Sequence, residues 1–163
     1  MPEKDEREKA QRLIADNRKA RHDYHILETY EAGIALLGTE VKAIREGRVN
    51  LRDSYARTES GEVWMMNVHI SPYSHRGYAE HAETRQRKLL LHRHEIRKLI
   101  GRTAEKGLTL VPLQMYFKNG RVKVLVGLAR GKQAHDKRET IRRREVDRET
   151  RAAIKVGRRR SSN

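Results

Sequence analysis

The segment from Leu108 to Ala129 constrains the fold of this chain most strongly, because it predicts two β-strands joined by a tight turn. Its sequence, LTLVPLQMYFKNGRVKVLVGLA, has alternating apolar residues on both sides of Asn119-Gly120. This dipeptide readily adopts the positive φ angles of a type I′ turn, which suits the twist of two antiparallel strands. The sequence therefore predicts a hairpin in which Leu113, Met115 and Phe117 share one face.

Two further segments have the composition of strands. YHILETYEAGIALL (residues 24–37) is rich in aromatic and branched residues, and Gly33 suits a bend or bulge where a long strand curves. In VWMMNVHI (residues 63–70), strict alternation places Trp64, Met66, Val68 and Ile70 on one side. This pattern predicts a half-buried strand with those four side chains toward the core.

Two short helices are expected between the strands. One is centred on GTEVKAIREG (residues 38–47) and the other on HRHEIRKLIG (residues 92–101), where Gly101 is placed to end the helix. Short antiparallel strands with a helix packed between them favour a closed barrel, because closure removes exposed strand edges. The predicted fold is mainly β with short helices, an OB-like closed antiparallel barrel; periodicity leaves an open α+β sheet as the alternative.

The distribution of apolar residues divides the chain into three parts. Residues 1–15 form a charged N-terminal arm, residues 16–130 hold the apolar clusters of the barrel domain, and residues 131–163 form a basic tail. From Arg130 to Asn163 there are 13 basic and 5 acidic residues, a net charge of +8. Such a tail is expected to be disordered when free and helical when bound to a polyanion that neutralises its self-repulsion.

Net charge indicates the class of partner. The chain has 37 Lys and Arg against 22 Asp and Glu, a formal charge of +15. A protein so basic is expected to bind polyanions, nucleic acid first and an anionic membrane surface second. It contains no Cys and no apolar run of membrane-spanning length, so we expect a cytoplasmic protein with no membrane partner.

The sequence offers little support for catalysis or metal binding. Its eight histidines include His92 and His94, but no HExxH or paired Cys/His pattern occurs. There is no GxSxG, no Walker-type loop and no acidic cluster for magnesium. Glu31 is a lone carboxylate that suits an ion pair or an RNA hydrogen bond better than a general base. We therefore expect no catalytic residue, no metal and no cofactor.

Two segments have the composition of an RNA contact. NRKARHDY combines cations, an amide and an aromatic ring, a set able to bind phosphates and stack on unpaired bases; a solvated basic strand at the entry to the domain is the alternative. Its candidate residues are Asn17, Lys19, Arg21, His22 and Tyr24. ARGKQAHDKRE (residues 129–139) follows the hairpin and is expected to be a hinge into the tail or a soluble linker.

Five segments of residues 17–138 carry a resemblance to a known family. They are NRKARHDY, TYEAGIALLGTEVKAIREGRVNLRDSYA, RKLLLHRHEI, GLTLVPLQMYFKNGRVKV and GLARGKQAHDKR. In this order they are similar to the SsrA-binding protein (SmpB) family. The resemblance implies an adaptor that binds the tRNA-like domain of transfer-messenger RNA (SsrA RNA) and brings it to stalled ribosomes for trans-translation.

The resemblance also implies partners and residue roles. The tail would enter the small-subunit decoding centre and the empty mRNA channel, and elongation factor Tu and alanyl-tRNA synthetase would act through the RNA. The protein would be a monomer. By position in the family's motifs, Glu31, Leu90 and Lys123 would contact transfer-messenger RNA, with an ordinary core position as the alternative for Leu90. The ribosome-facing residues of the tail would be Gly131, Lys132, His135, Asp136, Lys137 and Arg138.

Two other hypotheses remain open at this stage. An RNA-modifying or RNA-cleaving enzyme with an OB-like binding domain would use Glu31 and some of the histidines. A general ribosome-associated protein or RNA chaperone would need only the charge and would show little preference among structured RNAs.

Overall fold

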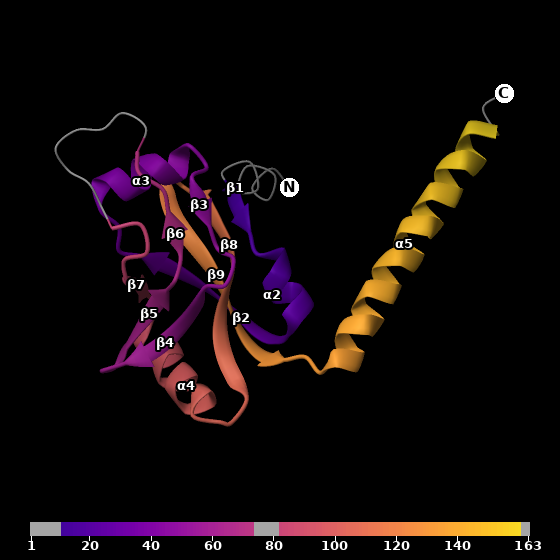
Figure 1. Cartoon of the computed structure of the whole chain (residues 1–163). Helices are drawn as coiled ribbons and strands as arrows, with labels where there is room; N and C mark the ends of the chain where they lie inside the picture. The colour runs from indigo at the N-terminus through magenta and orange to yellow at the C-terminus, as the bar shows by residue number, and fades with distance from the viewer. Residues whose placement is uncertain (1–10, 74–81, 161–163) are drawn as a thin grey trace, which may run out of the picture. The chain divides into compact units, whose positions relative to one another are not determined.

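The computed structural model describes residues 11–73 and 82–160 (Figure 1). The chain divides into two units, with the boundary after Gly131. The first unit is mainly β, with three short helices among the described residues. Its elements in chain order are β1 (Gln11–Asp16), α2 (Arg18–Asp23), β2 (Tyr24–Ile34), α3 (Gly38–Arg45), β3 (Val49–Asn50), β4 (Tyr55–Glu59), β5 (Glu62–Met66), β6 (His69–Ile70), β7 (Arg87–Leu90), α4 (Arg93–Thr103), β8 (Leu108–Lys118) and β9 (Arg121–Gly131).

Antiparallel pairing connects seven of the strands. Their order is β1-β8-β4-β5-β7-β2-β9, and β8 also pairs with β9. Six strands, β8, β4, β5, β7, β2 and β9, therefore each pair with two others, so the hydrogen-bonded pairing returns to its start; we call this set the strand ring. Two of these strand pairings are short: β4 and β8 are joined by the single pair Ala56↔Leu110, and β2 and β7 by the pairs Gly33↔Leu90 and Ile34↔Leu89. The mainly β, antiparallel prediction is confirmed.

The predicted hairpin is present as β8 and β9. Asn119 and Gly120 have φ angles of 51° and 74°, so the dipeptide makes the expected turn. The shared face was predicted wrongly, however, because the register shifts between Pro112 and Gln114. The bulge turns Leu113 to the opposite side of the sheet from Met115 and Phe117.

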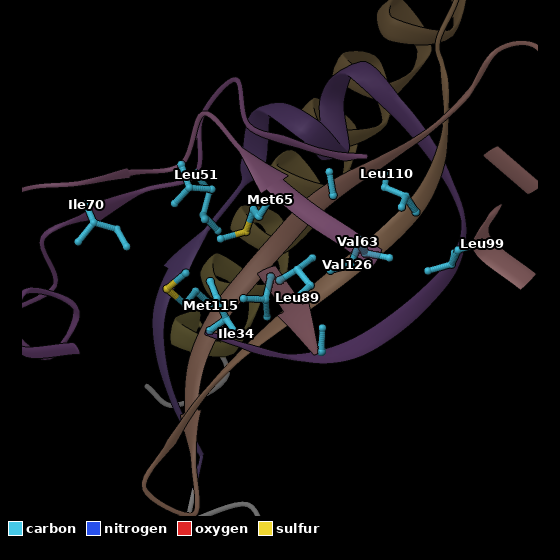
Figure 2. Close-up of a cluster of buried hydrophobic side chains, with 14 of the residues drawn as sticks. Ile34, Leu51, Val63, Met65, Ile70, Leu89, Leu99, Leu110, Met115 and Val126 are labelled. Atoms are coloured by element: carbon cyan, nitrogen blue, oxygen red, sulfur yellow. The ribbon is translucent and has the colours of Figure 1, made fainter. Parts of the chain in front are cut away.

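The main core is a cluster of buried side chains from the strands of the ring and from two helices (Figure 2). Fully buried side chains come from its strands, such as Met65, Leu89 and Val126, while α3 contributes Ile44 and α4 contributes Leu99. A second, smaller cluster lies on the outer side, where α2 covers the sheet with Ala20 against Val111, Leu113 and Ala129. The helices therefore exclude water from positions that the strands leave uncovered.

Strand β5 faces opposite to the prediction. Val63 and Met65 are fully buried, whereas Trp64 and Met66 are half-buried on the outer side. Asn67 has a φ of 59°, and the chain changes direction there before Val68 and Ile70 return to the core. The alternation of side chains does not continue through a residue with left-handed backbone, so the prediction of a single strand over residues 63–70 was wrong.

Helices α2 and α4 also differ from expectation. Helix α2 begins after Asn17, in a segment for which a helix was not predicted, and β1 pairs with β8 from Gln11 onward, within the expected N-terminal arm. Helix α4 continues to Thr103, so Gly101 lies inside it instead of ending it. Residues 1–10 of the expected arm lie outside the described residues.

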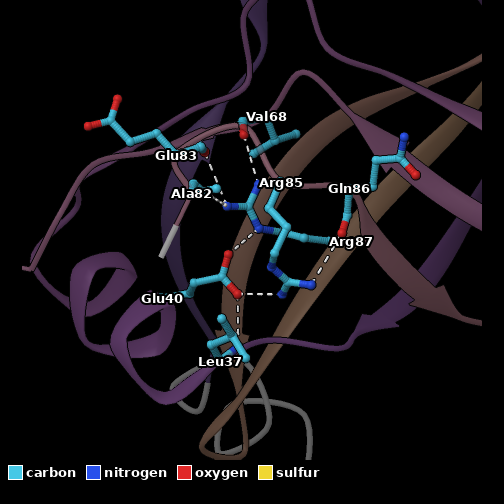
Figure 3. A network of polar contacts seen from close by, with 8 residues as sticks. All are labelled: Leu37, Glu40, Val68, Ala82, Glu83, Arg85, Gln86 and Arg87. Carbon is cyan, nitrogen blue, oxygen red and sulfur yellow. Dashed lines mark hydrogen bonds and ion pairs between the residues drawn. The ribbon is translucent and has the colours of Figure 1, made fainter. Parts of the chain in front are cut away.

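A buried ion-pair network ties α3 to β7 (Figure 3). Glu40 and Arg87 are fully buried, and Arg87 Nε donates to Glu40 Oε2. Arg85 Nη2 donates to Glu40 Oε1 over 2.6 Å, while Arg87 Nη1 donates to the Val68 carbonyl over 2.9 Å. Burial raises the pKa of Glu40, but the hydrogen bonds from Arg85, the Leu37 N–H and Arg87 more than offset this, and its pKa is lowered overall.

The second unit holds α5 (Ala134–Arg160), a helix of 27 residues. Its large apolar side chains Ile141, Val146 and Ile154 are about half exposed, at 45%, 54% and 53%. The helical state of the predicted tail is thus present, while disorder of the unbound tail stays a prediction. Among the described residues, no helix is both long and apolar enough to span a membrane.

Candidate nucleic-acid interface

Strand register brings Leu90 and Lys123 together on the outer side of the sheet. Both residues pair directly with Gly33 of β2, Leu90 from β7 and Lys123 from β9. Lys123 pairs with Tyr116 of β8, which in turn pairs with Leu13 of β1. Residues directly opposite each other in antiparallel strands share a face. These five residues form a row across five strands, which we call the outer row.

The outer row is hollowed at Gly33, between Leu90 and Lys123. Its missing side chain leaves a surface depression of about 350 Å³ whose lining includes Gly33, Leu90, Arg121 and Lys123. Leu90 is 52% exposed, which is unusual for a leucine on a strand. The hollow therefore combines an exposed apolar side chain with two cations, which suits the sugar and phosphate groups of a nucleotide.

Glu31 lies next to the outer row and organises its neighbours. Its carboxylate accepts a hydrogen bond from the Tyr116 hydroxyl over 2.5 Å and contacts Lys118 Nζ at 3.2 Å. The hydrogen bond from Tyr116 and the ammonium groups of Lys118 and Lys123 lower the pKa of Glu31, against the opposing effect of partial burial. A carboxylate with a lowered pKa is a poor general base at neutral pH. The geometry favours a structural or RNA-contacting role for Glu31.

The five candidates from NRKARHDY lie at the other end of β2. Tyr24 begins this strand, and Gly33 is nine positions further along it, about 30 Å of extended chain. Lys19 Nζ is 2.5 Å from Asp53 Oδ1, Arg21 Nη1 is 3.3 Å from Asp16 Oδ1, and His22 Nδ1 is 3.0 Å from Asp23 Oδ1. The structure therefore does not bring these candidates together with the outer row.

Asn17 has a structural environment. It is 4% exposed, its Nδ2 donates to the carbonyls of Leu51 and Pro112, and its Oδ1 accepts from Ala20 N. The last of these bonds caps the N-terminus of α2. The side-chain amide was predicted to contact RNA, but these three bonds use it inside the protein.

Tyr24 and Lys19 line a second hollow, of about 410 Å³, together with Asp53 and Tyr55. Tyr24 is half-buried and Tyr55 is 38% exposed. Two aromatic rings beside a lysine provide stacking and phosphate contacts of the kind used for unpaired nucleotides. This hollow is separate from the one at Gly33.

The tail candidates follow the last strand. Gly131 ends β9, paired with Tyr24, and Lys132 Nζ donates to Thr140 Oγ1 over 2.8 Å. Lys137 is half-buried and Arg138 is exposed. The side chains of His135 and Asp136 lie outside the described residues.

Sequence reasoning missed Tyr116, Lys118 and Arg121 as neighbours of the candidate site. The alternation of β8 was a usable signal, because after the bulge Tyr116 and Lys118 lie on the face opposite Met115 and Phe117. The sequence does not show the bulge between Pro112 and Gln114, however, so it could not place the face of Tyr116 and Lys118 beside Glu31. Among the described residues, no group of three or more His, Cys, Asp or Glu side chains is placed to hold a metal ion.

Comparisons with known proteins agree on one family. The family model described as SmpB protein matches residues 14–156. The SsrA-binding protein of Trichodesmium erythraeum is 61% identical over 146 residues, which cover 89% of this chain and 94% of the relative. The SsrA-binding protein of Carboxydothermus hydrogenoformans is 59% identical over 146 residues, which cover 90% of this chain and 98% of the relative. A solved chain from "tmRNA-SmpB: a journey to the center of the bacterial ribosome" is 56% identical, with a TM-score of 0.64 over 79% of this chain and 94% of that one.

Proposed function

The chain belongs to the SmpB family, and from this premise we propose that it is an adaptor that binds transfer-messenger RNA and delivers it to stalled ribosomes for trans-translation. The relatives carry the name SsrA-binding protein, and the description of the solved neighbour names tmRNA-SmpB and the bacterial ribosome. The observation that carries the proposal is the outer row, which places family-matched Leu90 and Lys123 on either side of Gly33.

The outer row and Glu31 form the proposed contact with the tRNA-like domain. Lys123 supplies a charge for a phosphate, Leu90 supplies an apolar surface, and Glu31 holds the Tyr116 hydroxyl and the Lys118 ammonium in place. The hollow beside Tyr24 and Lys19 extends this contact at the far end of β2. The strand ring supports an OB-like barrel, a fold whose outer strands and loops commonly bind nucleic acids.

The tail has a separate role in this proposal. Its described portion is a basic helix with exposed Arg138 and no large apolar face to bury against a protein core. Such a helix suits a channel lined by phosphates, where each cation releases condensed counterions. We propose that Gly131, Lys132, His135, Asp136, Lys137 and Arg138 face the decoding centre, and that the tail is disordered before it binds.

The remaining parts of the proposal concern partners. The protein is a monomer that works in the cytoplasm, where the ribosomes are, and elongation factor Tu and alanyl-tRNA synthetase act on its RNA partner and not on the chain. It catalyses no reaction. The lowered pKa of Glu31 agrees with this proposal, because it makes the one carboxylate considered as a general base a weaker base.

Competitive binding tests the proposal directly. The full chain is mixed with the labelled tRNA-like domain of SsrA RNA and with unlabelled ordinary tRNA at near-physiological salt. We expect at least tenfold preference for the SsrA fragment, about 1.4 kcal/mol. Equal, salt-sensitive binding to both RNAs would instead support the general RNA-binding hypothesis. Chemical change in the RNA after incubation with divalent metals would support the enzyme hypothesis.

A further inference from the structure

Strand register carries the outer row past Leu90 to strand β5. Strands β5 and β7 are antiparallel, and Val63 lies opposite Leu89. The next residues in this register are Glu62 and Leu90, which therefore lie side by side. Because Val63 and Leu89 are fully buried, Glu62 and Leu90 are on the outer side of the sheet. Glu62 is three inter-strand steps from Lys123, about 15 Å across the sheet.

A hollow begins at Glu62 and reaches helix α4. It has a volume of about 260 Å³ and lies between this helix and the turn that joins β4 to β5; its lining is Gly61, Glu62, Arg93, Ile96, Arg97 and Ile100. Ile100 is 40% exposed, so part of the lining is an apolar surface open to solvent. The hollow therefore continues the surface of the outer row and adds two guanidinium groups to it.

The cations of α4 are used differently on its two sides. On one side, Lys98 Nζ is 3.4 Å from Glu28 Oε2 and Arg102 Nη1 is 3.3 Å from Glu28 Oε1. On the other side, Arg93 and Arg97 are exposed and form no ion pair with any of the described residues. These two arginines are four positions apart, so they lie on the same face of the helix.

The carboxylates beside the two arginines already have partners. Glu62 Oε1 is 3.4 Å from Lys88 Nζ, and Glu95 Oε1 accepts from the backbone N–H of His92 over 3.3 Å. Neither carboxylate is therefore left to neutralise a guanidinium group of this hollow. The charge of the two arginines remains available to an anion from outside the chain.

We propose that Arg93 and Arg97 extend the transfer-messenger RNA contact past Leu90 and bind phosphates of the same RNA that lies along the outer row. The inference rests on the proposed function, because it adds two residues to that site. Continuity decides the occupant: Glu62 borders both Leu90 and the hollow, so an RNA on the outer row has its neighbouring backbone groups beside α4. Guanidinium groups bind phosphate oxygens in bidentate fashion, and exposed Ile100 suits a ribose or base.

The first test reverses the charge of the two arginines. The variant Arg93→Glu/Arg97→Glu is compared with Arg52→Glu/Lys106→Glu, which makes the same change in net charge at two exposed positions that line none of the hollows described above. The affinity of the full chain for the tRNA-like fragment is titrated at several salt concentrations. Thermal unfolding checks that both variants remain folded, and Arg93→Gln/Arg97→Gln repeats the titration without added negative charge.

We expect Arg93→Glu/Arg97→Glu to lose about tenfold or more in fragment affinity, with a salt dependence that is shallower by roughly one to two units in the slope. The glutamine variant should lose affinity in the same direction but by less. The control variant should stay within about threefold of wild type.

The second test detects the contact directly. The chain contains no cysteine, so Arg97→Cys and Lys106→Cys each carry a single photoreactive label. We expect the label at position 97 to cross-link to the tRNA-like fragment and the label at position 106 to give little product.

Three results would overturn the inference. Unchanged fragment affinity in the glutamate variant would show that the arginines are only solvated or serve another partner. Equal losses in the glutamate and control variants would show a general effect of charge, and equal cross-linking from positions 97 and 106 would show that the RNA is not held at α4. Failure of the wild type to prefer the fragment over ordinary tRNA would instead contradict the proposed function.

Discussion

Gly33 and Leu90 face each other across β2 and β7 so closely that a Cβ on Gly33 would lie 3.2 Å from the Cβ of Leu90. The absence of a side chain at position 33 is therefore what allows Leu90 to lie beside the strand with 52% of its surface exposed. Leu90 and Lys123 are separated by this single glycine, so no side chain stands between the two proposed RNA-contacting residues.

The first prediction follows from this close approach. Replacing Gly33 by Val adds a branched side chain that must displace Leu90 and fill the hollow, so we expect the affinity for the tRNA-like fragment to fall about tenfold or more. Fluorescence-based titration measures the affinity. The companion variant Leu90→Ala should also weaken binding; full affinity in both variants would remove the hollow from the proposed site.

The second prediction concerns the charge of Lys123. Changing it to Glu places two carboxylates near each other, because Lys123 is close enough to lower the pKa of Glu31. We expect about a tenfold or larger loss of fragment affinity and a shallower dependence on salt, by roughly one unit in the slope. Lys106→Glu, at an exposed position away from the outer row, is the charge-matched control and should bind nearly as wild type.

The third prediction concerns the buried network of Glu40, Arg85 and Arg87. Replacing Glu40 by Gln leaves the guanidinium of Arg87 buried without its counter-ion, so we expect a loss of about 3–5 kcal/mol in the free energy of unfolding. Because the folded-state pKa of Glu40 is lowered from 4.5, its contribution is present above pH 4.5 and lost as pH falls through the folded pKa.

Urea unfolding at several pH values checks both parts of this prediction. The wild type should lose stability on acidification below pH 4.5, and the Glu40→Gln variant should lose less over the same range because Gln does not titrate. Equal acid sensitivity of the two proteins would contradict the assigned role of Glu40.

The fourth prediction compares two glycines. A Cβ on Gly127 would lie 2.9 Å from Leu113 Cδ1 and 3.2 Å from Ile26 Cγ2, so Gly127→Ala should lower the free energy of unfolding by about 1–3 kcal/mol. Gly101 lies inside α4, and a Cβ added there would have no other atom within 4 Å. Gly101→Ala should therefore raise the free energy of unfolding by about 0.5–1 kcal/mol. Chemical denaturation measures both, and effects of the same sign would contradict the packing described for Gly127.

The fifth prediction separates the two units of the chain. Deleting residues 131–163 removes α5 but leaves the strand ring and its core, so binding of the tRNA-like fragment at near-physiological salt should change by no more than about threefold. Tagging of the nascent chain on stalled ribosomes in a reconstituted translation reaction should be abolished. Loss of fragment binding together with tagging would show that the two functions cannot be divided in this way.

Local sequence patterns predicted several elements correctly. The Asn119-Gly120 hairpin, the long strand β2, and the helices α3 and α4 were all expected from turn chemistry, residue type and apolar spacing. These features depend on residues within a few positions of one another. Helix α2 was missed although Asn17 is a local N-cap, its Oδ1 accepting from Ala20 N, because a helix of only six residues is too short to show an apolar periodicity.

The sequence by itself therefore determined the antiparallel hairpin and the polyanionic class of partner. Tertiary structure alone decided which side chains meet. Glu40 and Arg87 are 47 residues apart and Tyr116 and Glu31 are 85 apart, so no local spacing predicts either contact. The physical reason is register: a bulge or a left-handed residue, such as those at Leu113 and Asn67, turns every following side chain to the other face of the sheet.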